Sequence, residues 1–186
     1  MFDIQKQGDV SYFFNDGVAQ SVEPCTAHFG FSYWAYFIPP FAPASTLILG
    51  YGAGTIAQLM RKIWGDKLRI AGVDKEPLDI TGKDVLYKQD AIEFVKSGGG
   101  SYEYVIVDLF NGRDIEQRIF NEDFVKGLSK MTKRLLAVNS WNTGGLAIYL
   151  KHFRHLATKE FGGNIMRFFR PMESTEQFFI PPPYRK

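Results

Sequence analysis

The middle of the chain alternates short apolar runs with stretches of helical periodicity. Apolar runs predict buried β-strands at residues 46–49, 68–73, 85–88, 104–107 and 135–138. After the first run, apolar residues at positions 56, 59, 60, 63 and 64 have the i, i+3, i+4, i+7, i+8 spacing of one helical face. Further helical patterns follow at residues 91–96 and 120–131. Strands without polar alternation are buried on both faces, so we predict a parallel sheet covered by helices on each side.

The N-terminal part of the chain carries a different pattern. Asp16-Gly17 lies between apolar segments, and this dipeptide readily forms the tight turn of a β-hairpin. Residues 28–37 predict a short helix that ends before Pro39, because the residue preceding a proline avoids the helical conformation. We therefore expect residues 1–44 to form a hairpin and a helix that pack on a main domain of residues 45–186.

The C-terminal part of the chain completes the predicted sheet. Residues 146–156 predict a helix, and residues 165–169 and 177–180 predict two strands joined by a short polar link. A short link suits an antiparallel pair, so we expect a hairpin at one edge of the sheet. The expected fold is therefore α/β and doubly wound. It has a mostly parallel, seven-stranded sheet, a C-terminal antiparallel hairpin and a short N-terminal β-hairpin.

The composition narrows the classes of function. One cysteine, Cys25, excludes an internal disulfide, which favours a cytoplasmic protein. The net charge of +2 is too small for a protein that binds nucleic acid through counterion release. No apolar run reaches the roughly 18 residues of a membrane span, so we expect no membrane partner. His152 and His155 would lie i, i+3 on the predicted helix, but no Cys or carboxylate stands at ligand spacing, so we expect no metal site.

A glycine-rich loop follows the first strand and precedes a helix. Glycines let the backbone turn tightly and approach a ligand closely, with the helix N-terminus directed at it. Gly50, Gly52 and Gly54 have the G-x-G-x-G spacing typical of methyltransferase-type folds. Shifted by one glycine, Gly52, Gly54 and Ala57 have the G-x-G-x-x-A spacing of dinucleotide-binding folds. A tight turn without a ligand is the third interpretation of this loop.

Acidic residues follow three of the other predicted strands. Asp74 ends the second strand, where a carboxylate can accept hydrogen bonds from both ribose hydroxyls. Asp90 follows the third strand, where it can accept a hydrogen bond from an adenine amino group or simply cap the next helix. Asp108 follows the fourth strand. The carboxyl ends of the first and fourth strands flank the switch point of a doubly wound sheet, where ligands bind. Together with the glycine loop, these acidic residues predict a nucleoside site.

The sequence resembles the spermidine synthase family, within the wider class of S-adenosylmethionine-dependent methyltransferase folds. The resemblance rests on the D-G-x-x-Q hairpin motif at residues 16–20, the glycine loop at residues 47–54, and residues 90–94 and 104–112. It implies that S-adenosylmethionine, or its decarboxylated form, binds at the carboxyl edge of a sheet of methyltransferase type. The implied cofactor-binding residues are Gly50, Tyr51, Gly52, Gly54, Asp74, Lys75, Asp90, Ala91 and Asp108.

By this resemblance, each group of residues holds one part of the cofactor. The glycine loop holds the amino-acid or aminopropyl end, Asp74 the ribose, and Asp90 with Ala91 the adenine, while Asp108 faces the reacting centre. Two positions depart from the family. Ala53 stands where spermidine synthases carry the loop aspartate that holds the amine of the decarboxylated cofactor, and Asn111 replaces the second member of their D-x-x-D pair. A polyamine needs several facing carboxylates, so these departures argue against diamine chemistry.

The leading hypothesis is transfer of a methyl or aminopropyl group from a sulfonium cofactor to a small-molecule acceptor. Asp108 is the candidate to hold the nucleophile or take its proton, with Asn111 as a neutral positioning partner. The alternative is a catalytically degenerate module that binds S-adenosylmethionine or methylthioadenosine. A third hypothesis, a nicotinamide dehydrogenase, rests only on the shifted G-x-G-x-x-A spacing of the glycines. The aromatic residues of segment 29–41 also suggest a homodimer.

Overall fold

A computed structural model describes residues 3–15, 17–27, 32–78, 80–140, 145–175 and 180. Its centre is a seven-stranded sheet with the order β11-β12-β10-β7-β4-β5-β6. The strands are β4 (Ser45–Leu49), β5 (Arg69–Asp74), β6 (Val85–Lys88), β7 (Tyr102–Val107), β10 (Thr132–Ser140), β11 (Phe153–Phe161) and β12 (Asn164–Pro171). Strands β4, β5, β6, β7 and β10 are parallel, whereas β12 is antiparallel to both of its neighbours. This topology confirms the predicted mostly parallel sheet with an antiparallel hairpin at one edge.

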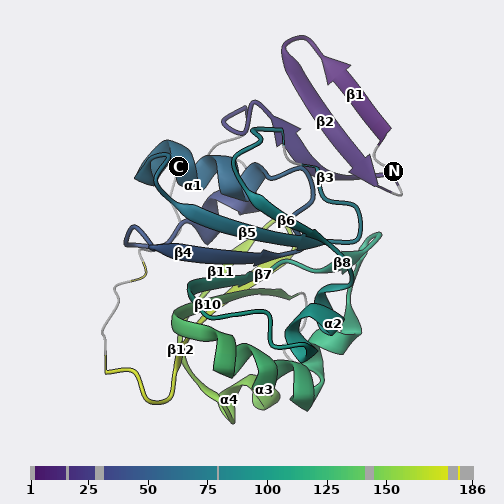
Figure 1. Cartoon of the computed structure of the whole chain (residues 1–186). Helices are drawn as coiled ribbons and strands as arrows, with labels where there is room; N and C mark the ends of the chain where they lie inside the picture. The colour runs from purple at the N-terminus through teal and green to yellow at the C-terminus, as the bar shows by residue number, and fades with distance from the viewer. Residues whose placement is uncertain are drawn as a thin grey trace.

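Helices cover both faces of the sheet (Figure 1). They are η1 (Tyr33–Phe37), α1 (Thr55–Trp64), α2 (Ala91–Lys96), η2 (Gln117–Phe120), α3 (Glu122–Met131) and α4 (Leu146–Leu150). Leu47 and Leu49 pack into the core under α2 and α3, while Ile48 between them packs into the core under α1. Successive strand residues point to opposite faces, which explains why residues 47–49 of β4 form a continuous apolar run. No helix in the described ranges is long and apolar enough to span a membrane.

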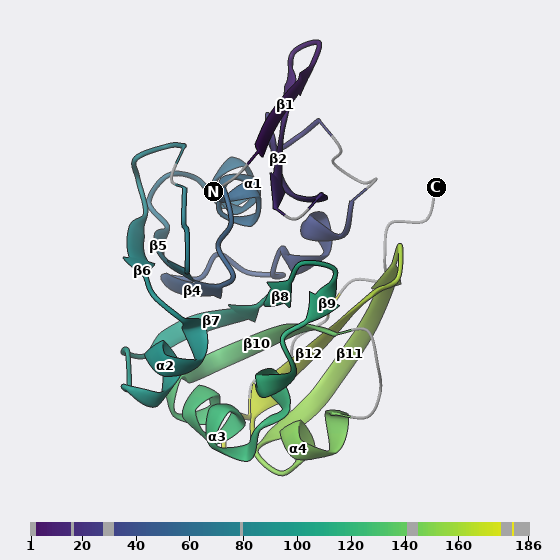
Figure 2. The same cartoon turned by 90° about the vertical axis from the view of Figure 1, so that its right-hand side faces the viewer.

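The N-terminal segment forms a second, three-stranded antiparallel sheet of β1 (Asp3–Gln7), β2 (Val10–Asn15) and β3 (Val18–Glu23). Its β2–β3 pair is the predicted hairpin, whereas β1 was not predicted because its residues are exposed and all but Ile4 are polar. Strands β1 and β2 project from the main body, as Figure 2 shows. The base of the sheet is tied to the glycine loop and α1: the Val22 amide donates to Thr55 Oγ1 at 2.9 Å, and the Ala53 amide donates to Ser21 Oγ at 2.9 Å.

The helix expected at residues 28–37 is observed only in part. The 3₁₀-helix η1 covers its second half, and residues 28–31 lie outside the described part of the chain. A further short ribbon, β8 (Phe110–Asn111) and β9 (Asp114–Ile115), follows β7 at the carboxyl edge of the main sheet.

The C-terminal hairpin is formed by other residues than those predicted. The predicted helix at 146–156 is wrong beyond Leu150, because β11 begins at Phe153 and pairs with β12. A β-bulge between His155 and Ala157 interrupts the strand alternation, so the apolar residues there mimic helical spacing. The strand expected at 165–169 lies within β12, while residues 177–179 of the other predicted strand lie outside the described part of the chain. His152 and His155 therefore do not share a helical face.

Candidate active site

A cavity of about 350 Å³ opens at the carboxyl ends of β4, β5 and β7. We call it the first cavity. Most of the residues predicted for the site line it: Gly50, Gly52, Asp74, Lys75, Asp90, Ala91, Asp108 and Asn111. The convergence follows from the topology, because β7, β4 and β5 are parallel neighbours and end at the same edge of the sheet. Tyr51 and Gly54, which were also predicted, do not line the cavity.

The glycine loop fits closely against the end of β7. Gly50 and Gly52 have φ values of 88° and 58°, which favour glycine. A Cβ atom on Gly50 would lie 2.1 Å from the carbonyl oxygen of Asp108. The Asp108 amide also donates to the Leu49 carbonyl at 2.9 Å. The loop and Asp108 are therefore held as one rigid unit, and only glycine fits at position 50.

Tyr51 anchors the loop from behind. Its ring is 4% exposed, and its hydroxyl donates to Asp84 Oδ2 at 2.6 Å. Arg61 of α1 forms a buried ion pair with the other oxygen of Asp84 and donates to the Leu68 carbonyl at 3.0 Å. The ring packs against Gly54 and Gly72, where any side chain would overlap it. The Tyr51 side chain thus supports the loop and does not face the cavity.

Asp74 connects the end of β5 to the loop. Its Oδ2 atom accepts from the Gly52 amide at 2.9 Å, and its Oδ1 atom accepts from the Glu76 amide at 3.0 Å. Each carboxylate oxygen has two lone pairs. The carboxylate can therefore fix the loop and still accept hydrogen bonds from a ligand in the cavity.

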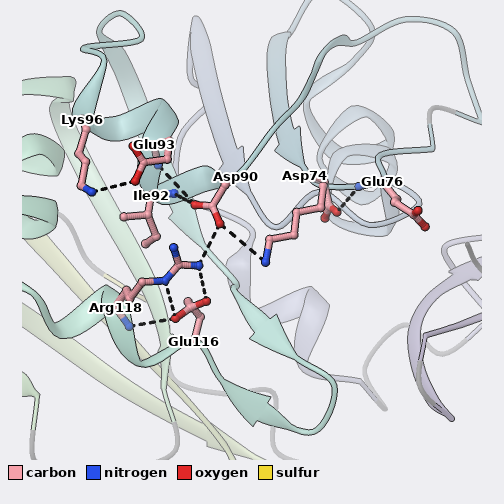
Figure 3. A network of polar contacts seen from close by, with 9 residues as sticks. Asp74, Glu76, Asp90, Ile92, Glu93, Lys96, Glu116 and Arg118 are labelled. Atoms are coloured by element: carbon pink, nitrogen blue, oxygen red, sulfur yellow. Dashed lines mark hydrogen bonds and ion pairs between the residues drawn. The ribbon is translucent and has the colours of Figure 1, made fainter.

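Asp90 lies in a network of hydrogen bonds and ion pairs, of which only the helix cap was predicted from the sequence (Figure 3). Its Oδ1 atom accepts from the Ile92 amide at 2.9 Å, which confirms the predicted helix cap. Its Oδ2 atom accepts from Arg118 at 2.9 Å and lies 3.7 Å from Lys75 Nζ. Burial opposes ionisation of Asp90, but the hydrogen bonds from Arg118 and Ile92 outweigh it and lower its pKa. Arg118 also pairs with Glu116 at 2.7 Å.

Asp108 is the most buried carboxylate of the cavity, with 9% of its surface exposed. Its Oδ1 atom accepts from Asn139 Nδ2 at 2.9 Å, and its Oδ2 atom accepts from the Tyr33 hydroxyl at 3.2 Å. Burial raises the pKa of Asp108 to about 6, against the opposing effect of these two hydrogen bonds. Burial and the nearby Asp108 keep the pKa of Tyr33 well above its usual value, so Tyr33 remains a donor.

Sequence reasoning missed Tyr33, Asn139 and Arg118. Asn139 had a detectable signal, because it is the first polar residue after an apolar strand that ends at the predicted edge. Tyr33 lay inside an aromatic segment that gave no reason to single it out. Arg118 lies on η2, away from every motif, and its role depends on how η2 packs beside Asp90.

The raised pKa of Asp108 predicts a stability change with pH. The native carboxyl binds its proton more tightly than the unfolded one, so its contribution to stability is greatest below about pH 4 and falls through pH 6. The variant Asp108→Asn should therefore match the wild type near pH 4 and exceed it by about 3 kcal/mol above pH 7. Urea unfolding across this range measures the difference. Equal unfolding free energies of the wild type and the variant at every pH would show that burial does not raise the pKa of this carboxyl.

A second cavity of about 390 Å³ adjoins the first. Its lining residues are Gly17, Val18, Ala19, Gln20, Tyr33, Phe110, Gly112, Arg113 and Asn164. Gln20, Phe110 and Gly112 line both cavities. The hydrogen bond from Tyr33 to Asp108 joins a residue of the second cavity to a residue of the first. The arrangement offers a polar site for a nucleoside beside a separate site for a second molecule.

Comparison with known proteins identifies the fold. No protein-family model matches the sequence, and no curated protein matches it. A probable spermidine synthase from Corynebacterium glutamicum is similar in structure, with a TM-score of 0.73 and 17% identity over 96% of this chain and 78% of that one. Aeropyrum pernix fibrillarin in complex with S-adenosylmethionine has a TM-score of 0.57 and 11% identity, over 90% and 97% of the two chains.

Human N-acetylserotonin methyltransferase in complex with S-adenosylmethionine is a third similar structure. Its TM-score is 0.57 at 13% identity, over 80% of this chain and 53% of that one. In all three comparisons the similarity extends over most of this chain. The chain therefore has the Rossmann-like fold of the S-adenosylmethionine-dependent methyltransferases and their spermidine synthase-like relatives.

Proposed function

We propose that the protein binds S-adenosylmethionine in the first cavity and transfers its methyl group to a small-molecule acceptor. The observation that carries this proposal is the convergence of Asp74, Asp90 and Asp108 with the glycine loop around one cavity. The cavity volume of about 350 Å³ is within the usual range for small-molecule sites. Two structures of similar fold were solved with S-adenosylmethionine, which supports the same ligand here.

Each part of the cofactor has a candidate partner. The free lone pairs of Asp74 would accept the ribose hydroxyls, and the backbone around Ala91 would contact the adenine. The methionine part would lie over Gly50 and Gly52, which line the cavity. Position 53, where spermidine synthases carry the loop aspartate that holds an amine, is a buried alanine, so the loop offers no carboxylate there. This favours the carboxylated cofactor and methyl transfer over aminopropyl transfer.

Asp108 is the proposed base. When methyl transfer occurs, the acceptor atom bonds to the methyl carbon, the carbon–sulfur bond breaks with its electron pair passing to sulfur, and the acceptor proton passes to Asp108. A carboxyl with a pKa of about 6 is ionised at neutral pH and is more basic than an ordinary aspartate. Tyr33 and Asn139 fix the orientation of its carboxylate. Asn111 lines the same cavity and would contact the acceptor.

Calorimetric titration with S-adenosylmethionine tests the proposal. We expect micromolar binding by the wild type and at least about 100-fold weaker binding by Asp74→Ala, which loses two charge-assisted hydrogen bonds to the ribose. Asp114→Ala is the matched control, since Asp114 is exposed on β9 and does not line the cavity. Binding of NAD alone would contradict the proposal. Binding of S-adenosylmethionine without turnover would favour the degenerate binding module.

A further inference from the structure

We infer that the second cavity binds the acceptor and that this acceptor carries a carboxylate, paired with Arg113. The inference rests on the proposed function and adds the chemical class of the acceptor. The second cavity adjoins the first through Gln20, Phe110 and Gly112, so a molecule in it lies beside the proposed cofactor site.

The charge of the second cavity sets the class of ligand. Arg113 is the one charged residue in its described lining. Within the described part of the chain, Arg113 has no hydrogen bond and no ion pair, although Arg118 nearby pairs with both Asp90 and Glu116. A planar guanidinium that has no partner among the described residues can bind a carboxylate through two parallel hydrogen bonds. A single cation balances one negative charge, which favours a carboxylate over a doubly charged phosphate ester.

The same charge argues against a polyamine. A cationic ligand in this cavity would meet Arg113 and, among the described lining residues, no carboxylate. Asp108, which accepts hydrogen bonds from Asn139 and Tyr33, is a single carboxylate that lies in the adjoining cavity. One carboxylate of this kind cannot neutralise a ligand with two or more positive charges.

The remaining lining residues describe the body of the acceptor. Val18, Ala19 and Phe110 provide an apolar wall, and the Phe110 ring can pack against a flat ligand. Tyr33 lines the same cavity and donates its hydroxyl hydrogen to Asp108. An acceptor with an apolar or aromatic body can therefore present a hydroxyl toward Tyr33 and Asp108 while its carboxylate contacts Arg113.

Three probes test this inference: 4-hydroxyphenylacetate, its neutral amide 4-hydroxyphenylacetamide, which has the same size and shape, and the smaller diamine putrescine. Each is titrated into the protein, which has first been saturated with S-adenosylhomocysteine. We expect the acid to bind at least about tenfold more tightly than the amide, the value of one charge-assisted contact, and putrescine not to bind. Arg113→Gln should remove this preference, because it should weaken binding of the acid and leave binding of the amide unchanged. Arg154→Gln, an exposed arginine of β11 that does not line the cavity, should leave it unchanged.

The outcomes separate the two proposals. If S-adenosylhomocysteine does not bind, the proposed function fails and the acceptor inference fails with it. If S-adenosylhomocysteine binds but the acid shows no preference over the amide, or keeps its affinity in Arg113→Gln, only the acceptor inference is overturned. Binding of putrescine more tightly than the acid would also overturn it. Arg113 is exposed on the β8–β9 turn, so its replacement should leave the melting temperature unchanged.

Discussion

The Asp108→Asn variant is expected to lose about 10²–10⁴-fold in methyl transfer while binding S-adenosylmethionine almost as tightly as the wild type. Asparagine keeps the shape of the side chain, and its oxygen can still accept the hydrogen bond from Asn139. It cannot accept a proton from the acceptor. The same substitution should stabilise the fold above pH 7, because it removes a charge from a site where only 9% of the residue is exposed.

The distinctive result for Asp108→Asn would be a loss of activity together with a gain in stability. Single-turnover transfer under saturating cofactor measures the first, and urea unfolding at pH 7.5 measures the second. Asn111→Ala is the comparison variant: it removes a group that lines the cavity without removing a base, so its loss should be smaller and independent of pH. Turnover by Asp108→Asn at the wild-type rate would remove Asp108 from the catalytic role and leave it as a residue that orients its neighbours.

The second large effect is expected for Asp84→Ala, which should cost about 3–5 kcal/mol of unfolding free energy. The side chains of Arg61 and Asp84 are 6% and 1% exposed, so the substitution leaves a guanidinium buried without its counterion. It also removes the acceptor of the Tyr51 hydroxyl, which holds the back of the glycine loop. We therefore expect weaker cofactor binding together with the loss of stability.

Asp66→Ala provides the matched control for this effect. Asp66 forms a 2.8 Å ion pair with Lys83, but both side chains are about half exposed or more, and such pairs contribute little. Its loss should change the unfolding free energy by less than about 1 kcal/mol. Chemical denaturation of both variants measures the contrast. If both variants lost a similarly small amount of unfolding free energy, Arg61 would have to find another partner when Asp84 is removed.

The site was predictable where its chemistry depends on strand ends. Asp74, Asp90 and Asp108 each follow an apolar run, and parallel strands bring their carboxyl ends to one edge whatever the details of packing. Tyr33 and Arg118 reach the same region from η1 and η2, through contacts between segments far apart in the chain. No local pattern encodes such contacts, so sequence reasoning could not assign these two residues.

The fold was predictable for a related reason. Strands buried on both faces carry continuous apolar runs, such as residues 47–49 of β4, 104–107 of β7 and 135–138 of β10, and these runs mark the three strands clearly in the sequence. Strand β11 lies at the edge of the sheet and is only partly buried, and its bulge shifts the alternation by one residue. Its amino acids therefore match a helix as well as a strand, and only pairing with β12 decides between them.

The position of the Tyr51 ring has a consequence for how this turn can vary among homologues. A Cβ atom would lie 2.2 Å from that ring at Gly72 and 2.6 Å from its hydroxyl oxygen at Gly54. Substitutions at positions 51, 54 and 72 are therefore coupled, because a bulky residue at position 51 excludes a side chain at the other two. Exchange of Tyr51 for a small residue would remove this contact at Gly72, where the Leu86 side chain at 2.8 Å would also have to shift, whereas Gly54 still needs its φ of 79°. In a library randomised at all three codons, the surviving clones should show compensating side-chain volumes at positions 51 and 72.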